Sequence, residues 1–325
     1  MNALSRRQFG KIAIASVPFG ALLGPTRAAA AGHLSLGVST YSFRDFPRIL
    51  GQDNIDDVIR AIQAVHITDI ELAFSNVEPA PPSTAPFMGG TPAYPQRIVL
   101  TPEQIASSNH VSRAQLREWR RVTPLTYFEA VQSKFAAAGL VVHACGISYD
   151  DSFTDAEIDA TFRQAKAMGV STISSAMTMA TAQRLVPFAE QHQMSVAIHN
   201  QMAQNPAGAI SGAQMREALR LSPAFRLKLD IGNLTASNGD AVVELGELQA
   251  RVSHVLVRDR LRNGGASQPF GEGDTPITPV LGMLAAARTP IPALVEYDYA
   301  GIHSSVYEVA ASVAYLSNAR PGAAQ

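Results

Sequence analysis

The sequence predicts a single (β/α)₈ barrel, and three features of the chain carry that prediction. Short runs rich in Val, Ile and Leu recur along the chain, each is followed by a longer segment with helical spacing, and polar residues stand where the runs end. Near-continuous apolar strands that alternate with helices are typical of a parallel sheet covered on its outer face, and eight such units close into a barrel.

The expected strands are eight in number, and amphipathic helices fill the segments between them. In chain order the strands are residues 35–43, 69–74, 141–148, 172–177, 195–200, 226–232, 253–259 and 292–298. The clearest helical segments are residues 53–65, 155–168, 181–192 and 212–221. No linker or change in composition divides residues 32–320, so we expect one barrel domain there, a length that this fold accommodates.

One connection is much longer than the others. Residues 76–123, between the second and third strands, begin Pro- and Ser-rich and then become helical. An insertion at this point would lie over the top of the barrel, where lids belong, although its Pro-rich part could equally be a surface loop. The helical part contains Trp119, the one tryptophan of the chain, which favours a lid there.

The first 31 residues have the features of a removed export signal. Arg6 and Arg7 precede an apolar stretch of about thirteen residues and a run of alanines, which is typical of a twin-arginine signal and too short to span a bilayer. We therefore expect a periplasmic protein with no membrane span after cleavage. Removal of Arg6, Arg7, Lys11 and Arg27 would leave 22 basic against 27 acidic residues, a net charge of −5. That balance argues against nucleic acid as the partner.

Polar residues at the ends of the strands are the candidates for chemistry, because in a parallel barrel these ends meet at one face. His199, Asp230 and Glu296 end the fifth, sixth and eighth strands and could converge on one cation. An imidazole and two carboxylates suit a transition metal better than Ca²⁺, and such an ion would stabilise a developing enediolate. The alternative is a hydrogen-bonded polar network without metal.

The remaining strand ends suggest proton transfer and ligand binding. Glu71 could be a general base with a pKa raised by its environment, or it could form a salt bridge to Arg44, Arg258 or Arg260. The run Arg258-Asp259-Arg260 could bind hydroxyls or an anionic group, or it could be an internally neutralised ion-pair cluster. The expected ligand-orienting set is Tyr41, Arg44, His143, Asn200, Arg258 and Arg260.

Five stretches of the chain carry a resemblance to a known family. They are AIHNQ, LDIGNLTASNGD, LVRDR, PFGEGDTPI and LVEYDY. With them the chain resembles the xylose-isomerase-like TIM-barrel proteins called sugar phosphate isomerase/epimerases, and in particular an exported branch. The resemblance implies a divalent metal such as Mn, Zn, Co or Mg at the barrel mouth, and chemistry through an enediolate.

The chain departs from the pattern of that family at several positions. Relatives generally carry histidines at the positions of Gln201, Asn233 and Leu256, so His199, Asp230 and Glu296 are what is left of the expected ligand set. His254 keeps the strand parity of Leu256 but sits about 6–7 Å lower along the strand.

Two functions follow from these expectations. The first is a metal-dependent isomerase, epimerase or lyase acting on a keto-sugar or related carbohydrate, with Glu71 or Glu296 moving the proton. The alternative is a non-catalytic sugar-binding barrel with a degenerate metal site. The sequence does not specify the sugar, and it leaves association into a homo-oligomer open.

Overall fold

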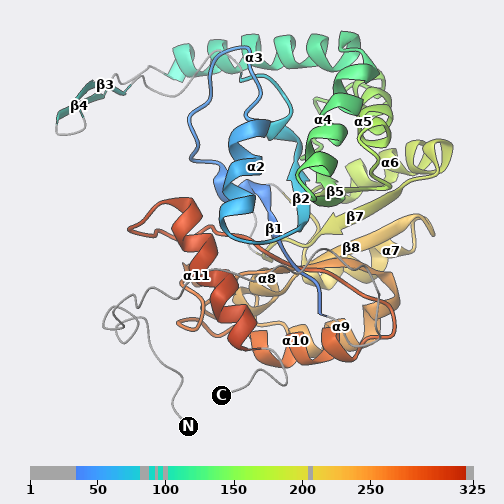
Figure 1. The fold of residues 1–325 in the computed structure, drawn as a ribbon. Helices are drawn as coiled ribbons and strands as arrows, with labels where there is room; N and C mark the ends of the chain where they lie inside the picture. Colours follow the sequence, from blue (N-terminus) through green and yellow to red (C-terminus); the bar gives the residue numbers. More distant parts are fainter. Residues whose placement is uncertain (1–33, 81–87, 92–93, 98–101, 204–207, 320–325) are drawn as a thin grey trace.

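A computed structural model describes residues 34–80, 88–91, 94–97, 102–203 and 208–319, and of residues 88–91, 94–97 and 102–110 it describes the backbone (Figure 1). The predicted signal lies outside the described residues. No helix in the part of the chain that the structure describes is both long and apolar enough to cross a membrane.

The eight predicted strands are all present, and they close into a parallel barrel in the order β1-β12-β9-β8-β7-β6-β5-β2. The strands are β1 Leu36–Ser39, β2 Asp69–Ala73, β5 Val141–Gly146, β6 Thr172–Ser175, β7 Ser195–His199, β8 Phe225–Asp230, β9 Val252–Val257 and β12 Ala293–Val295. Every neighbouring pair in this closed sheet is parallel. The predicted fold class is therefore confirmed.

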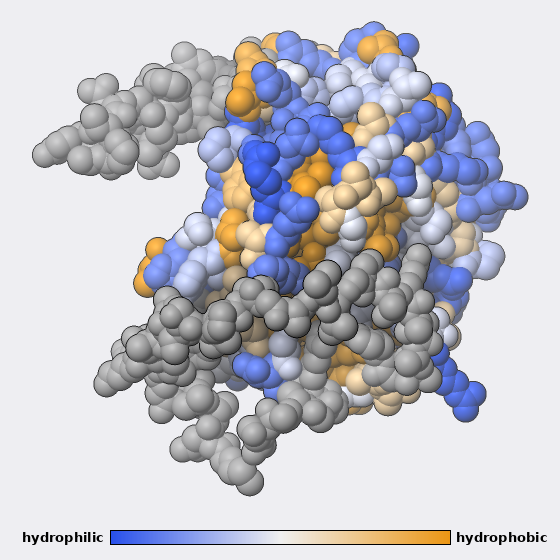
Figure 2. Space-filling view, viewed as in Figure 1, coloured by the Kyte–Doolittle hydropathy of each residue, from blue (hydrophilic) through white to orange (hydrophobic). Residues whose placement is uncertain are grey.

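Helices surround the barrel, as alternation of strand and helix requires (Figure 1). They are α2 Ile55–Ala64, α3 Pro102–Val122, α4 Leu125–Ala137, α5 Asp155–Ala167, α6 Met179–His192, α7 Met215–Leu219, α8 Ile231–Ala236, α9 Ala241–Leu248, α10 Ile277–Ala286 and α11 Ser305–Asn318. Hydrophilic residues dominate much of the outer surface of these helices in Figure 2, because their apolar sides face the strands.

Local sequence explains where individual helices begin and which side they bury. In α2 the residues Ile55, Val58 and Ile62 are buried at helical spacing, whereas Asp57 and Arg60 face solvent. In α5 the hydroxyl of Thr154 accepts a hydrogen bond from the backbone N–H of Glu157, and the carboxylate of Glu157 accepts one from the N–H of Thr154. This capping box fixes the first turn of α5.

The long insertion contains the hairpin β3 Met88–Thr91 with β4 Tyr94–Arg97, followed by α3, and the hairpin projects away from the barrel (Figure 1). The indole ring of Trp119 packs edge-on against the rings of Tyr127 and Phe128 in α4. Arg117 and Arg120 both form ion pairs with Glu157 in α5. The described side chains of α3 thus attach it to the outer helix layer, and the predicted lid role stays a prediction.

Candidate functional site

The barrel interior contains buried ionisable side chains on β8 and on and just after β9. Side chains two residues apart on a strand point to the same face, so Lys228 and Asp230 of β8 share the barrel interior, as do His254 and Arg258 on and just after β9. All four are buried. TIM-barrel interiors are normally filled by branched apolar side chains, so these ionisable groups need partners.

The first group of partners, here called the mouth cluster, lies at the C-terminal ends of β7, β8, β9 and β12. It consists of His199, Asp230, Arg258, Glu296 and Asp298. His199 Nε2 lies 2.9 Å from Asp230 Oδ2, and the guanidinium of Arg258 also bonds this oxygen. Arg258 Nη1 lies 2.6 Å from Asp298 Oδ2 and 3.5 Å from Glu296 Oε1. Of the side chains predicted as metal ligands, His199 and Asp230 therefore contact each other directly, whereas Glu296 is connected to Asp230 through Arg258.

A second group, here called the inner cluster, lies deeper in the barrel and is formed by Glu71, Ser174, Lys228 and His254. Lys228 Nζ lies 2.6 Å from Glu71 Oε2, and His254 Nε2 lies 3.3 Å from Glu71 Oε1, an oxygen that also accepts a hydrogen bond from the hydroxyl of Ser174. Lys228 also stands 4.0 Å from Glu296 Oε2, which connects the inner cluster to the mouth cluster.

The environment of Glu71 corrects the expectation about its acidity. Burial alone would raise the pKa of this carboxyl group, but the charge of Lys228 and the hydrogen bond from His254 outweigh burial and hold the pKa well below its usual value. The same ion pair raises the pKa of Lys228 against the lowering effect of burial. The expectation of a raised Glu71 pKa was wrong, and so were its expected partners Arg44, Arg258 and Arg260, because Lys228 takes that place.

In the mouth cluster, the surroundings lower the pKa values of both His199 and Asp230. Burial lowers the pKa of His199, the charge of Lys228 lowers it further, and the hydrogen bond to Asp230 offsets only part of this. Burial would raise the pKa of Asp230, but the charge of Arg258 and the bond from His199 bring it far below its usual value. At neutral pH the pair is thus a neutral imidazole beside an ionised carboxylate.

Two asparagines hold the Asp230 end of β8 in place. Asn200 Nδ2 donates to the carbonyl oxygen of Asp230 at 3.0 Å, and Asn200 Oδ1 accepts from the Asp230 N–H at 2.8 Å. Asn233 donates its side-chain amide to the carbonyl oxygen of Asn200 and its backbone N–H to Asp230 Oδ1. Asn200 is fully buried and spends its amide on the backbone, so its structural contacts are those of a positioning residue.

The Arg258-Asp259-Arg260 run is not an internally neutralised cluster, because its members bond elsewhere. Arg258 joins the mouth cluster, while Asp259 accepts hydrogen bonds from the backbone N–H groups of Gly271, Gly273 and Thr275. Arg260 donates to Asn233 Oδ1 and to the carbonyl oxygen of Gly265. Each of the three charged side chains therefore bonds to a different segment of the chain.

Tyr41 and Arg44 lie together beyond the end of β1, in and after the short helix η1 Thr40–Phe43. The guanidinium of Arg44 stacks on the rings of Tyr41 and Tyr297, 5.2 and 5.5 Å from their centroids, and donates to the carbonyl oxygen of Tyr297. Tyr41 is 48% exposed, so its ring is available to a ligand. Tyr297 lies between Glu296 and Asp298 in the chain, so the bond from Arg44 to its carbonyl oxygen ties Arg44 to the segment that carries these two residues of the mouth cluster.

His143 does not join these residues. The register between β2 and β5 shifts after Ile70, so that Glu71 pairs with Ala144. His143 Nε2 lies 2.5 Å from the carboxylate of Asp69, the first residue of β2. His143 is thus tied to the N-terminal end of the barrel, away from the mouth where the sequence had placed it.

The donor set does not fit the divalent ion that the family resemblance implies. Both oxygens of Asp230 already accept hydrogen bonds from the protein, and both oxygens of Glu296 face a cation of the protein. Leu256, at the position where the family resemblance implies a histidine, is fully buried. Within the described ranges no three His, Cys, Asp or Glu side chains are grouped as a metal site would require.

Sequence reasoning missed three members of these clusters: Ser174, Lys228 and Asp298. A signal for Lys228 was present, because a lysine between leucines in the run RLKLDIG would be costly to bury without an acidic partner. Ser174 and Asp298 carry no comparable signal, since serine and aspartate are common near strand ends and in turns.

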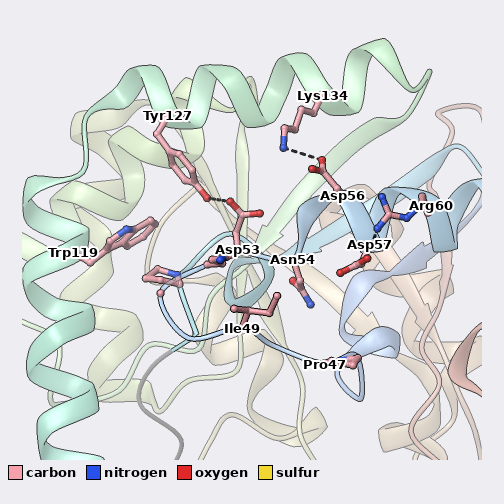
Figure 3. Close-up of a pocket in the computed structure, with 13 residues that line it drawn as sticks. Pro47, Ile49, Asp53, Asn54, Asp56, Asp57, Arg60, Trp119, Tyr127 and Lys134 are labelled. Atoms are coloured by element: carbon pink, nitrogen blue, oxygen red, sulfur yellow. Dashed lines mark hydrogen bonds and ion pairs between the residues drawn. The ribbon is translucent and has the colours of Figure 1, made fainter.

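A separate groove lies outside the barrel, among α2, α3 and α4 (Figure 3). It has a volume of about 560 Å³ and is lined by Trp119, Tyr127 and a row of acidic residues at the start of α2. The acids already have partners: Asp53 accepts from the Tyr127 hydroxyl, and Asp56 accepts from Lys134. The groove is therefore a surface depression with its charges internally satisfied.

The fold places the protein in the structural class of (β/α)₈ TIM barrels, and its solved neighbours include xylose-isomerase-like proteins. No family model and no curated protein matches the sequence. Among solved structures, a xylose isomerase domain protein from Planctomyces limnophilus is similar over 88% of this chain and 95% of its own, with a TM-score of 0.55 and 14% identity. At such identities the likeness concerns the fold alone.

Two further similar structures are of proteins named for an activity on sugars. A sugar phosphate isomerase/epimerase from Parabacteroides distasonis is 14% identical, covers 91% of this chain and 96% of its own, and has a TM-score of 0.53. The 3-keto-D-glucoside 4-epimerase YcjR from E. coli is 12% identical, covers 87% of this chain and 99% of its own, and has a TM-score of 0.55.

Proposed function

We propose that the protein is an enzyme that isomerises or epimerises a keto-sugar or related carbohydrate, or eliminates water from it, by moving a proton next to a carbonyl group. The observation that carries the proposal is the His199–Asp230 pair at the mouth. Asp230 is ionised, so His199 Nε2 carries the hydrogen of their 2.9 Å contact and Nδ1 is left to accept a proton. A neutral imidazole oriented by a carboxylate is a common general base.

Arg258 would supply the positive charge that the reaction needs. Abstraction of a proton next to a carbonyl places negative charge on the carbonyl oxygen, and a fixed cation in a buried site stabilises that charge. Arg258 Nε is buried and has no hydrogen-bond partner among the described residues, and the same holds for Asp298 Oδ1. Buried polar atoms normally have partners, and a sugar hydroxyl or carbonyl can serve as one.

Tyr41 and Arg44 would bind the part of the substrate away from the reacting carbon. An exposed tyrosine ring suits the apolar face of a sugar, and a guanidinium held over two aromatic rings donates to hydroxyl oxygens. The structurally similar E. coli epimerase is named for activity on a 3-keto-D-glucoside, which supports a keto-sugar as the substrate class. The twin-arginine signal predicted from residues 1–31 would place this substrate in the periplasm.

The alternative is a sugar-binding barrel without catalysis. It is favoured by the loss of family histidines, since Leu256 stands at one such position and is buried. In that case the mouth cluster would bind hydroxyls and Nδ1 of His199 would accept a hydrogen bond from the ligand without removing a proton.

Exchange of substrate protons with solvent separates the two functions. Keto-sugars are incubated with the protein in D₂O and followed by NMR, which detects proton abstraction even when no net product forms. An active protein exchanges the proton next to the carbonyl, and His199→Gln slows the exchange by about 10²–10⁴-fold. The matched control is His192→Gln, because His192 makes a similar 2.8 Å contact with Asp159 on the outer helices. If calorimetry detects sugar binding but no sugar tested exchanges its proton with solvent, the enzyme proposal fails and the non-catalytic sugar-binding barrel is supported.

A further inference from the structure

We infer that Arg258 is a built-in replacement for the divalent cation of this barrel class, so that the protein excludes divalent metal from its mouth. The inference concerns the cation at the mouth and does not depend on the proposed reaction. It begins from the position of the guanidinium, which contacts three carboxylates: Asp230, Asp298 at 2.6 Å and Glu296 at 3.5 Å.

Those carboxylates come from the strands whose ends would hold a metal, and Arg258 already uses the oxygens that a metal would need. Asp230 Oδ2 accepts from both Arg258 and His199, while Asp230 Oδ1 accepts from the N–H of Asn233 at 2.8 Å. Glu296 Oε1 faces Arg258, and Glu296 Oε2 faces Lys228 at 4.0 Å. A metal ion could bind only by displacing these donors.

The charge at the mouth also opposes metal binding. Arg258 is buried, with 8% of its surface exposed, and a guanidinium stays protonated in proteins. A divalent ion beside a buried guanidinium would be repelled in a medium of low dielectric constant. Lys228 adds a second fixed positive charge on the inner side of Glu296.

A glycine lets the backbone segment that carries Arg258 lie close to the start of α8, next to Asp230. Gly232 faces it closely, because a Cβ built on this glycine would lie 2.9 Å from both the Cβ and the carbonyl oxygen of Arg258. Any larger residue at position 232 would push β9 and its arginine away from Asp230. Gly232 thus keeps the segment that carries Arg258 within reach of Asp230.

Metal uptake by purified, metal-stripped protein tests the inference. After equilibrium dialysis against Mn²⁺, Co²⁺ or Zn²⁺, the expected metal content of the wild type is far below one ion per chain. Arg258→Gln removes the charge and frees the carboxylates, so we expect it to bind about one ion per chain, at least about tenfold more tightly than the wild type. The double variant Arg258→Gln with Asp230→Asn should lose that ion again.

Two control variants test whether metal binding depends on the positive charge at position 258 itself or on the loss of an arginine from any carboxylate cluster. Arg258→Lys keeps a cation in the cluster and should bind no more metal than the wild type. Arg216→Gln removes an arginine that also bridges two carboxylates, Glu244 and Glu247, but on the outer helices, and should bind none.

The inference is overturned if the wild type binds one ion per chain and Asp230→Asn abolishes that binding. It is also overturned if Arg258→Gln is folded and binds no more metal than the wild type. Should Arg258→Gln fail to fold, the wild type and Arg258→Lys still decide: no uptake by either supports the replacement, and uptake by the wild type contradicts it.

Discussion

Replacing Lys228 with methionine tests how the barrel tolerates charge in its interior. Lys228 and Glu71 are both nearly fully buried, and Lys228 Nζ lies 2.6 Å from Glu71 Oε2. Methionine keeps most of the volume of the lysine and removes its charge, which leaves Glu71 ionised in the interior with His254 and Ser174 as its remaining hydrogen-bond partners among the described residues. Removing one member of a buried pair costs about 3–5 kcal/mol.

We therefore expect Lys228→Met to lower the free energy of unfolding by about 3–5 kcal/mol at pH 7.5. At about 2–4 °C per kcal/mol for a domain of this size, the melting temperature falls by roughly 6–20 °C. Urea denaturation followed by circular dichroism measures the free energy, and the double variant Lys228→Met with Glu71→Gln provides the control. The double variant should recover part of the loss, because it removes the uncompensated charge.

The pH dependence of the stability lost in Lys228→Met gives a second measurement. In the wild type the folded-state pKa of Glu71 lies well below its usual value of 4.5, so the contribution of Glu71 to stability is present above that value and is lost as the pH falls below it. Without Lys228, burial should raise the folded-state pKa of Glu71 instead. The deficit of Lys228→Met should then shrink as the pH falls from 7.5 to 5.5.

Three results would refute this reasoning. They are a loss below about 1 kcal/mol, a double variant no more stable than the single one, and a deficit that is the same at both pH values.

Three further predictions concern residues outside the two clusters. The thiol of Cys145 is fully buried and its pKa is raised mainly by burial, so it should react with a thiol reagent only after denaturation, and reaction in the native protein would contradict its placement. Gly273→Ala would put a Cβ 2.2 Å from Asp259 Oδ1 and should cost about 1–3 kcal/mol by breaking the loop bonds to Asp259. Denaturation beside Gly246→Ala measures this cost, because a Cβ at Gly246 would meet only the end of the Met283 side chain, at 3.5 Å. Trp119→Ala should cost about 2 kcal/mol through lost aromatic packing. In the wild-type protein, the emission of this single tryptophan should shift to longer wavelength together with barrel unfolding. An earlier, separate shift would show that α3 is not attached as described.

The strands and their order could be predicted from the sequence for a local reason. A buried parallel strand must be apolar on both faces, so each of the eight appears as a short run of Val, Ile and Leu, and the connecting helices show the 3.6-residue period. The same rule placed the polar residues His199, Asp230 and Glu296 at one end of the barrel, since parallel strands all finish at the same face.

The sequence could not predict where each polar side chain points in detail. A one-residue shift in the pairing of β2 with β5 moved His143 to Asp69 at the opposite end of the barrel, and such irregularities leave no local pattern. Asn200 likewise looked like a ligand-binding residue, but its amide is taken by the backbone of Asp230.

By itself, the sequence determined the barrel, its eight strands and the end at which polar groups gather, because these depend on patterns within each segment. Tertiary structure alone decided which charges meet. Arg258 lies between Asp230 and Glu296, and Lys228 lies against Glu71, because closure of the barrel brings together side chains that are far apart in the chain. The identity of the cation at the mouth depends on those distances across the barrel, which no single stretch of sequence encodes.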